Sequence, residues 1–121
     1  MSKFVVLVGH CNFDGPRLQR EIETKVAPCK VLRVNDVPSL TEACENGVDL
    51  LLINREPVGF DEAGLDLVKD LHSRYPQQKI MLVSDYADAQ QQAIGCGALP
   101  GFGKADMGSP KLIETVKGAI G

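Results

Sequence analysis

Long apolar runs, clusters of basic side chains and closely spaced cysteines are all missing from this sequence of 121 residues. No stretch approaches the ~20 apolar residues that a membrane-spanning helix needs. The 13 Lys and Arg residues are scattered among 16 Asp and Glu residues, so the net charge is -3 and no basic stripe marks a nucleic-acid surface. No two cysteines form a CxxC pair, the spacing typical of redox and zinc motifs. These absences argue against a membrane protein, direct nucleic-acid binding and a zinc module.

An export signal is also missing from the start of the sequence. Lys3 precedes only five apolar residues, Phe4–Val8, which is too short for the core of a signal peptide. We therefore expect a cytoplasmic protein, in which cysteines stay reduced and act as inert, mostly buried thiols. The cysteines are Cys11, Cys29, Cys44 and Cys96.

Five short runs rich in Val, Leu and Ile are present, and each stops at a polar or glycine residue. They are Phe4–Val8, Lys30–Val34, Leu50–Ile53, Ile80–Val83 and Leu99–Phe102. Such runs are typical of strands buried on both faces, as in parallel sheets. Segments with helical spacing follow every run. This alternation predicts an α/β protein: one domain over residues 1–121, folded as a three-layer, doubly wound (βα)5 sandwich around a five-stranded parallel sheet.

The spacing of apolar residues predicts five helices. Asp14 is expected to cap the first, and Ser39–Glu42 forms a capping box for the second. The second helix should end at residue 46, the third should cover about 61–75, and the fifth should start at 109. The fourth, about 87–95, has few apolar residues, and we interpret its Gln90–Gln92 stretch as solvated. We therefore expect this helix to be held weakly and to be locally mobile.

The residues that end the runs are the candidate site, because ligands bind outside the carboxyl ends of parallel strands. They are Gly9 with His10, Asn35, Asn54, Ser84, and Gly103 with Lys104. The central run ends in an amide, and no carboxylate stands there. That absence limits the chemistry available at this site.

Three blocks of sequence resemble the receiver domain of response regulators, the CheY-like and flavodoxin-like fold. Asp49–Pro57 resembles the third strand and the loop after it, and Lys79–Ser84 resembles the fourth strand with its terminal hydroxyl. Gly97–Lys104 resembles the fifth strand with its terminal lysine. The order and spacing of the three blocks carry the resemblance, which extends over nearly the whole chain.

The resemblance implies roles for the residues at the strand ends. Asn54 stands at the position of the phosphoacceptor aspartate, and Gly9 and His10 stand at the positions of the acidic pair that holds Mg²⁺. Ser84 and Lys104 match the residues that contact the phosphoryl group. Phe102 matches the switch aromatic; its alternative interpretation is an ordinary buried strand residue. Ala105 replaces the proline that follows the lysine in the family.

The missing carboxylates make phosphotransfer of the usual kind improbable on chemical grounds. A neutral carboxamide is a very poor nucleophile, and Mg²⁺ needs one or two carboxylates among its oxygen ligands. We expect no metal, no cofactor and no enzymatic activity. We also expect Lys104 to pair with Asp85, and His10 to be hydrogen-bonded at the edge of the pocket.

Rival chemistries find less support in the sequence. His10 and Cys11, with Asp14, Glu56 and Asp85 near the same rim, do not form a convincing metal site, because adjacent strand residues point to opposite sides. No cysteine has both a base and an orienting partner, and we interpret His72 as solvated. The loop after the first run lacks the Ser and Thr residues of a flavin phosphate cradle, and aromatic residues make up only 5% of the chain.

The sequence thus predicts a degenerate, atypical receiver, or pseudo-receiver. It would work in two-component signal transduction or a phosphorelay through phosphorylation-independent contact with a protein partner. The face implied by the resemblance is the fourth helix, fifth strand and fifth helix, roughly Ala87–Ile120. Two alternatives stay open: a sensor of a small anion or nucleotide at Ser84 and Lys104, and a structural spacer in a larger regulator. The sequence does not determine the oligomeric state.

Overall fold

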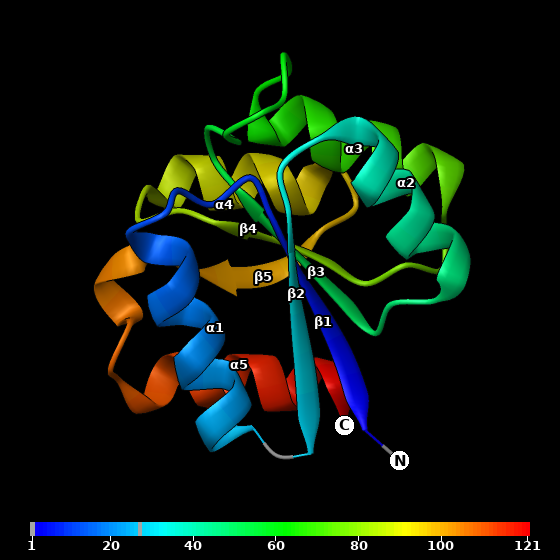
Figure 1. The fold of residues 1–121 in the computed structure, drawn as a ribbon. Coiled ribbons are helices and arrows are strands. Elements are labelled where there is room, and N and C mark those ends of the chain that lie inside the picture. The colour runs from blue at the N-terminus through cyan, green and yellow to red at the C-terminus, as the bar shows by residue number, and fades with distance from the viewer. Residues whose placement is uncertain (1, 27) are drawn as a thin grey trace.

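A computed structural model describes residues 2–26 and 28–121, which form one sheet flanked by helices (Figure 1). The strands, all parallel, are β1 (Lys3–Val8), β2 (Cys29–Val34), β3 (Leu50–Asn54), β4 (Ile80–Val83) and β5 (Leu99–Phe102). Their spatial order is β2-β1-β3-β4-β5. The predicted five-stranded parallel sheet is confirmed, and each predicted strand agrees with the structure to within one residue.

Across the residues that the structure describes, five α-helices and one short 3₁₀ helix connect and follow the strands. They are α1 (Asp14–Lys25), α2 (Val37–Asn46), α3 (Gly64–Arg74), α4 (Ala87–Gly95), η1 (Lys104–Asp106) and α5 (Pro110–Ile120). Helices α1 and α5 cover one face of the sheet, and α2, α3 and α4 cover the other (Figure 1). The three-layer (βα)5 sandwich predicted from the alternation is therefore confirmed.

Each face of the sheet has its own hydrophobic core, since successive strand residues point to opposite faces. In β1, Val5 and Leu7 pack toward α1 and α5, whereas Val6 and Val8 pack toward α2 and α3. All five residues of β3 are buried, as a central strand covered on both faces requires. The apolar runs identified in the sequence form the strands of this sheet, which is buried on both faces.

Two helix starts differ from the sequence prediction. Asp14 is the first residue of α1 and not its cap: the N-cap residue is Phe13, and the Asp14 carboxylate contacts Lys104 instead. Helix α2 starts two residues before the predicted capping box, because Asp36 is the cap and its carboxylate accepts a hydrogen bond from the Ser39 amide at 2.8 Å. That bond also holds the pKa of Asp36 below its ordinary value.

Helix α3 starts at Gly64, three residues later than about residue 61, where the sequence pattern placed it. The Gly64 amide donates to the Arg55 carbonyl at 2.8 Å, which ties the start of α3 back to the end of β3. A Cβ at residue 64 would lie 2.4 Å from the Asn54 carbonyl oxygen, so only glycine allows this close approach. Within the described residues, no helix is both long and apolar enough to span a membrane.

Candidate functional site

The carboxyl ends of β1 and β3 lie side by side at the point where the strand order reverses. From β1 the chain passes outward to β2 and then returns to β3 on the other side of β1. In doubly wound sheets this switch point is the usual ligand crevice. The crevice brings together Gly9 and His10, which follow β1, and Asn54, which ends β3.

Gly9 has no room for a side chain. Its φ is 71°, and a Cβ there would lie 2.4 Å from the Pro57 Cβ. The Gly9 carbonyl accepts hydrogen bonds from the Val58 amide at 2.8 Å and from the Asn54 side chain at 3.0 Å. The β3–α3 loop is therefore closed down over the position where the resemblance would place an acidic side chain.

Asn54 is buried and uses its amide group to donate hydrogen bonds. Its Nδ2 donates to the Gly9 carbonyl at 3.0 Å and to the Glu56 carbonyl at 3.2 Å. Both partners are acceptors only, so the amide orientation follows from their chemistry. An aspartate could not make these two bonds, because an ionised carboxylate has no hydrogen to donate. Asn54 thus ties β1 to the β3–α3 loop.

His10 is 1% exposed, deeper than the pocket-edge position expected from the sequence. Its Nε2 lies 2.9 Å from the Leu52 carbonyl oxygen, so Nε2 carries the proton and donates it. Burial is the largest influence and lowers the pKa of His10 from 6.5 to about 4, so the ring is neutral at pH 7. Its Nδ1 is buried without a hydrogen-bond partner among the described residues.

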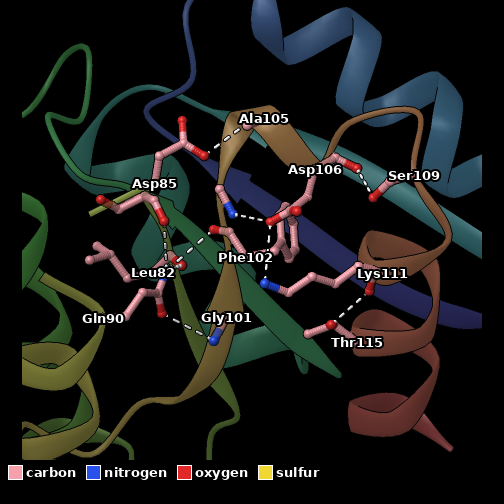
Figure 2. A network of polar contacts seen from close by, with 12 residues as sticks. Leu82, Asp85, Gln90, Gly101, Phe102, Ala105, Asp106, Ser109, Lys111 and Thr115 are labelled. Atoms are coloured by element: carbon pink, nitrogen blue, oxygen red, sulfur yellow. Dashed lines mark hydrogen bonds and ion pairs between the residues drawn. The ribbon is translucent and has the colours of Figure 1, made fainter. Parts of the chain in front are cut away.

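Lys104 pairs with Asp14 and not with Asp85, which corrects the expectation from the sequence. The Lys104 Nζ lies 2.9 Å from the Asp14 Oδ2. This hydrogen-bonded ion pair holds the pKa of the Asp14 carboxyl below its ordinary value. Asp85 accepts a hydrogen bond from the Ala105 amide at 3.0 Å instead, and so joins the β4–α4 loop to η1 (Figure 2).

The other two predicted residues are buried at the ends of β4 and β5. Ser84 uses its Oγ to accept a hydrogen bond from the Tyr86 amide at 3.2 Å. Phe102 is 1% exposed and packs in the core beneath α1 and α5, as expected of a strand aromatic. Its carbonyl accepts from the Ser84 amide at 2.9 Å, which links the two strand ends.

A hollow of about 230 Å³ lies over the ends of β3 and β4. Its lining residues are Asn54, Arg55, Glu56, Val83, Ser84, Asp85, Tyr86 and Lys104. The charged side chains here already have partners: Arg55 pairs with Glu56 at 3.2 Å and stacks on the Tyr86 ring at 4.8 Å from its centre. The hollow thus contains two cations and two anions and has no surplus of either charge.

These residues do not fit the Mg²⁺ that the resemblance would imply. Gly9 has no side chain, the Nε2 of His10 is occupied by Leu52, and the Asn54 amide donates to carbonyl groups. Mg²⁺ prefers carboxylate oxygens in octahedral geometry. Across residues 2–26 and 28–121, no group of three or more His, Cys, Asp and Glu side chains is placed to hold a metal ion.

Two further expectations from the sequence are wrong. His72 is only partly exposed: its Nδ1 is buried, and its ring lies so close to Gly97 that a Cβ there would come within 2.4 Å of it. Gln91 and Gln92 are exposed as expected, but Gln90 is partly buried. Its carboxamide makes four hydrogen bonds, to Leu82 of β4, to Ser84 just after β4, and to Gly101 and Phe102 of β5 (Figure 2). The four cysteines are partly buried, which is more exposed than expected.

Comparison with known proteins places this geometry in a structural class. No family model and no curated protein sequence matches the chain. Solved structures do match. A response regulator from Thermotoga maritima is 18% identical, with 99% of this chain and 98% of that chain aligned and a TM-score of 0.78. The receiver domain of the TMAO respiratory system response regulator TorR is 25% identical, with 96% and 94% aligned and a TM-score of 0.74. This chain has the receiver-domain fold.

A third match adds a chemical contrast to the receiver fold. A response regulator from Burkholderia pseudomallei, solved with a phosphorylated aspartic acid and a calcium ion, is 21% identical. The alignment covers 100% of this chain and 67% of that chain, with a TM-score of 0.69. In the present chain, the ends of β1 and β3 carry Gly9, His10 and Asn54.

Proposed function

We propose that this chain is a pseudo-receiver: a signalling domain, comprising residues 1–121, that works by binding another protein and not by accepting a phosphoryl group. The observation that carries the proposal is the Asn54 carboxamide, whose NH₂ group donates to the Gly9 and Glu56 carbonyls. A phosphoacceptor must present a carboxylate oxygen to the phosphorus. Here the side chain at the corresponding strand end is neutral and serves to hold two loops together.

The closed state of the crevice supports the same proposal. Pro57 fills the space in which a side chain at residue 9 would lie, and His10 is neutral and bonded to Leu52. The two side chains expected to meet a phosphoryl group already have partners within the described residues, since Lys104 pairs with Asp14 and the Ser84 Oγ accepts from the Tyr86 amide. These pairings also weigh against the alternative of a small-anion or nucleotide sensor.

Intact-mass measurement tests the proposal directly. The protein is incubated with Mg²⁺ and a small-molecule phosphodonor, and the Burkholderia pseudomallei response regulator serves as the positive control. We expect no added mass on this chain while the control gains a phosphoryl group. A stoichiometric gain of one phosphoryl group on the wild-type chain would refute the pseudo-receiver proposal.

The surface that we assign to the partner is formed by α4, β5 and α5. A groove of about 510 Å³ runs along it, lined by Ile94, Pro100 and Lys111 among others. Ile94 is a large apolar residue on this face and is 37% exposed. Substitution Ile94→Glu should abolish co-purification of the partner, whereas Leu32→Glu, at an exposed apolar residue on edge strand β2, should not. Equal recovery with both variants would show that the face is wrong.

A further inference from the structure

Strand β5 joins the sheet through an irregular pairing. Met81 of β4 pairs with Leu99, and Val83 pairs with Phe102, so the single residue Leu82 faces two residues of β5. The extra residue is a β-bulge, and it leaves backbone groups without their ladder partners. Pro100 has no N–H to lose, but the amide of Gly101 and the carbonyl of Leu82 both need partners in a part-buried setting.

The side chain of Gln90 satisfies the groups that the bulge leaves open. Its Oε1 accepts from the Gly101 amide at 3.1 Å, and its Nε2 donates to the Leu82 carbonyl at 2.8 Å (Figure 2). The same Nε2 lies 3.1 Å from the Ser84 carbonyl oxygen and 3.3 Å from that of Phe102, so two hydrogens are shared by three acceptors. Only an amide offers both the donors and the acceptor that this arrangement requires.

Helix α4, which carries Gln90, has little else to hold it against the sheet. Of its nine residues only Ala93 is buried, and a methyl group contributes little hydrophobic burial. Its N-cap residue Tyr86 makes no capping hydrogen bond through its side chain, and Tyr86 and Ile94 at the two ends are 59% and 37% exposed. The main polar contact between this helix and the sheet is therefore the Gln90 carboxamide.

We propose that Gln90 is a positioning residue: its carboxamide completes the β4–β5 bulge and fixes α4 beside β5, and so sets the shape of the groove at the protein-binding face. The role of that face in docking rests on the proposed function. We call the four hydrogen bonds of the Gln90 carboxamide the clasp. The clasp does not rest on the proposed function, because it is argued from the bulge, these four bonds and the sparse apolar packing of α4. Gln90 also lines the groove of that face.

Neighbouring residues of the same type provide matched controls. Gln91 and Gln92 share the helix and the side chain but are exposed. In the wild-type protein, NMR should show the side-chain NH₂ protons of Gln90 exchanging with water about tenfold or more slowly than those of Gln91 and Gln92. Equal exchange rates for the three side chains would overturn the proposal without any variant being made.

A substitution tests whether the clasp positions the helix. Gln90→Met keeps the length of the side chain and removes its hydrogen bonds. Amides of α4 and the Gly101 amide should then exchange about tenfold faster, while those of α3 and α5 keep their rates. Gln91→Met should leave all of these rates unchanged. If α4 exchanges at the wild-type rate in Gln90→Met, Gln90 does not position the helix.

These measurements use the isolated protein and so separate the two proposals. Failure of the clasp would appear as unchanged exchange in Gln90→Met and would leave docking at this face standing. Failure of the docking proposal would appear as partner binding that survives Ile94→Glu. The exchange measurements would still decide whether Gln90 holds α4.

Discussion

Two neutral polar side chains at the strand ends act as donors to backbone carbonyls. Asn54 donates to Gly9 and Glu56, and His10 donates to Leu52. Buried donors paired with carbonyl acceptors stabilise a fold, whereas an anion at the same place would face oxygen atoms. The hydrogen bonds of Asn54 and His10 thus give both residues a structural role, and each residue leads to a prediction.

Placing a carboxylate at residue 54 should destabilise the protein. Asn54→Asp removes two hydrogen bonds and places negative charge near the Gly9 and Glu56 carbonyl oxygens. We expect a loss of about 2–4 kcal/mol in the free energy of unfolding, measured by urea denaturation at pH 7. Asn35→Asp, at an exposed residue, is the control and should change it by no more than about 0.5 kcal/mol. Unchanged stability in Asn54→Asp would contradict the structural role.

The buried imidazole should make stability depend on pH. Because the pKa of His10 is lowered from 6.5 to about 4, the unfolded chain binds a proton in this interval and the folded protein does not. Stability is therefore full above about pH 6.5 and falls as the pH drops toward 4, by roughly 3 kcal/mol. His10→Gln keeps a donor for Leu52 but cannot titrate, so urea denaturation at several pH values should show a flatter profile. A variant that retains the wild-type slope would disprove this assignment.

Sequence reasoning found the residues of the crevice but missed how they are used. The parallel-sheet pattern located Gly9, His10 and Asn54, since strand ends meet at one edge of the sheet. The partner of Lys104 was assigned wrongly, because Asp14 approaches it from α1 and no local spacing encodes that contact. The buried position of His10 depends on its hydrogen bond to the Leu52 carbonyl of β3, which is likewise a tertiary contact.

At the scale of the element, α4 and β5 form the part of the fold that departs furthest from regular packing. The boundaries of α4 agree with the sequence prediction, and its scarcity of apolar anchors was visible in the composition. The role of Gln90 was not, because a run of three glutamines looks uniformly polar. Pro100-Gly101 inside a strand pattern was the available signal, since both residues favour a bulge.

Glycines in β5 and α5 should respond to alanine in opposite ways. In Gly101→Ala the new Cβ would lie 2.3 Å from the Leu82 carbonyl oxygen, so the bulge must shift and stability should fall by about 1–3 kcal/mol. Gly118 lies inside α5 with no atom within 4 Å of an added Cβ, so Gly118→Ala should stabilise by about 0.5–1 kcal/mol. Thermal denaturation measures both. A neutral Gly101→Ala would contradict the close approach of the two strands.

The whole molecule is a sheet between two hydrophobic cores. The alternation of apolar strands and helical segments in the sequence made this architecture the most predictable feature. Two contacts between residues far apart in the sequence join α1 to the segment between β5 and α5. Lys104 pairs with Asp14 at 2.9 Å, and the Gly108 amide donates to the Glu21 carboxylate at 2.8 Å. These contacts fix the loop from the side opposite α4. They depend on the arrangement of distant segments, so no local pattern announces them.

The intact protein should be indifferent to Mg²⁺. The resemblance implies that active receivers hold several carboxylates close together, which repel one another until a cation binds. In this chain the corresponding residues, Gly9, His10 and Asn54, are uncharged. We expect the melting temperature to be the same with and without millimolar Mg²⁺, at constant ionic strength, in a thermal-denaturation assay. A rise of several degrees would mean that a cation site exists and that the account of the crevice is wrong.

The contact of Pro57 with Gly9 has a consequence for evolution. An acidic side chain at residue 9 has no space while Pro57 stays, and the Gly9 carbonyl is a hydrogen-bond acceptor for Asn54. A mutation that introduces a carboxylate at residue 9 would clash with Pro57, and one at residue 54 would remove the hydrogen bond to the Gly9 carbonyl. An acidic crevice would therefore require coordinated substitutions at several positions, which places a high barrier on any evolutionary route toward one.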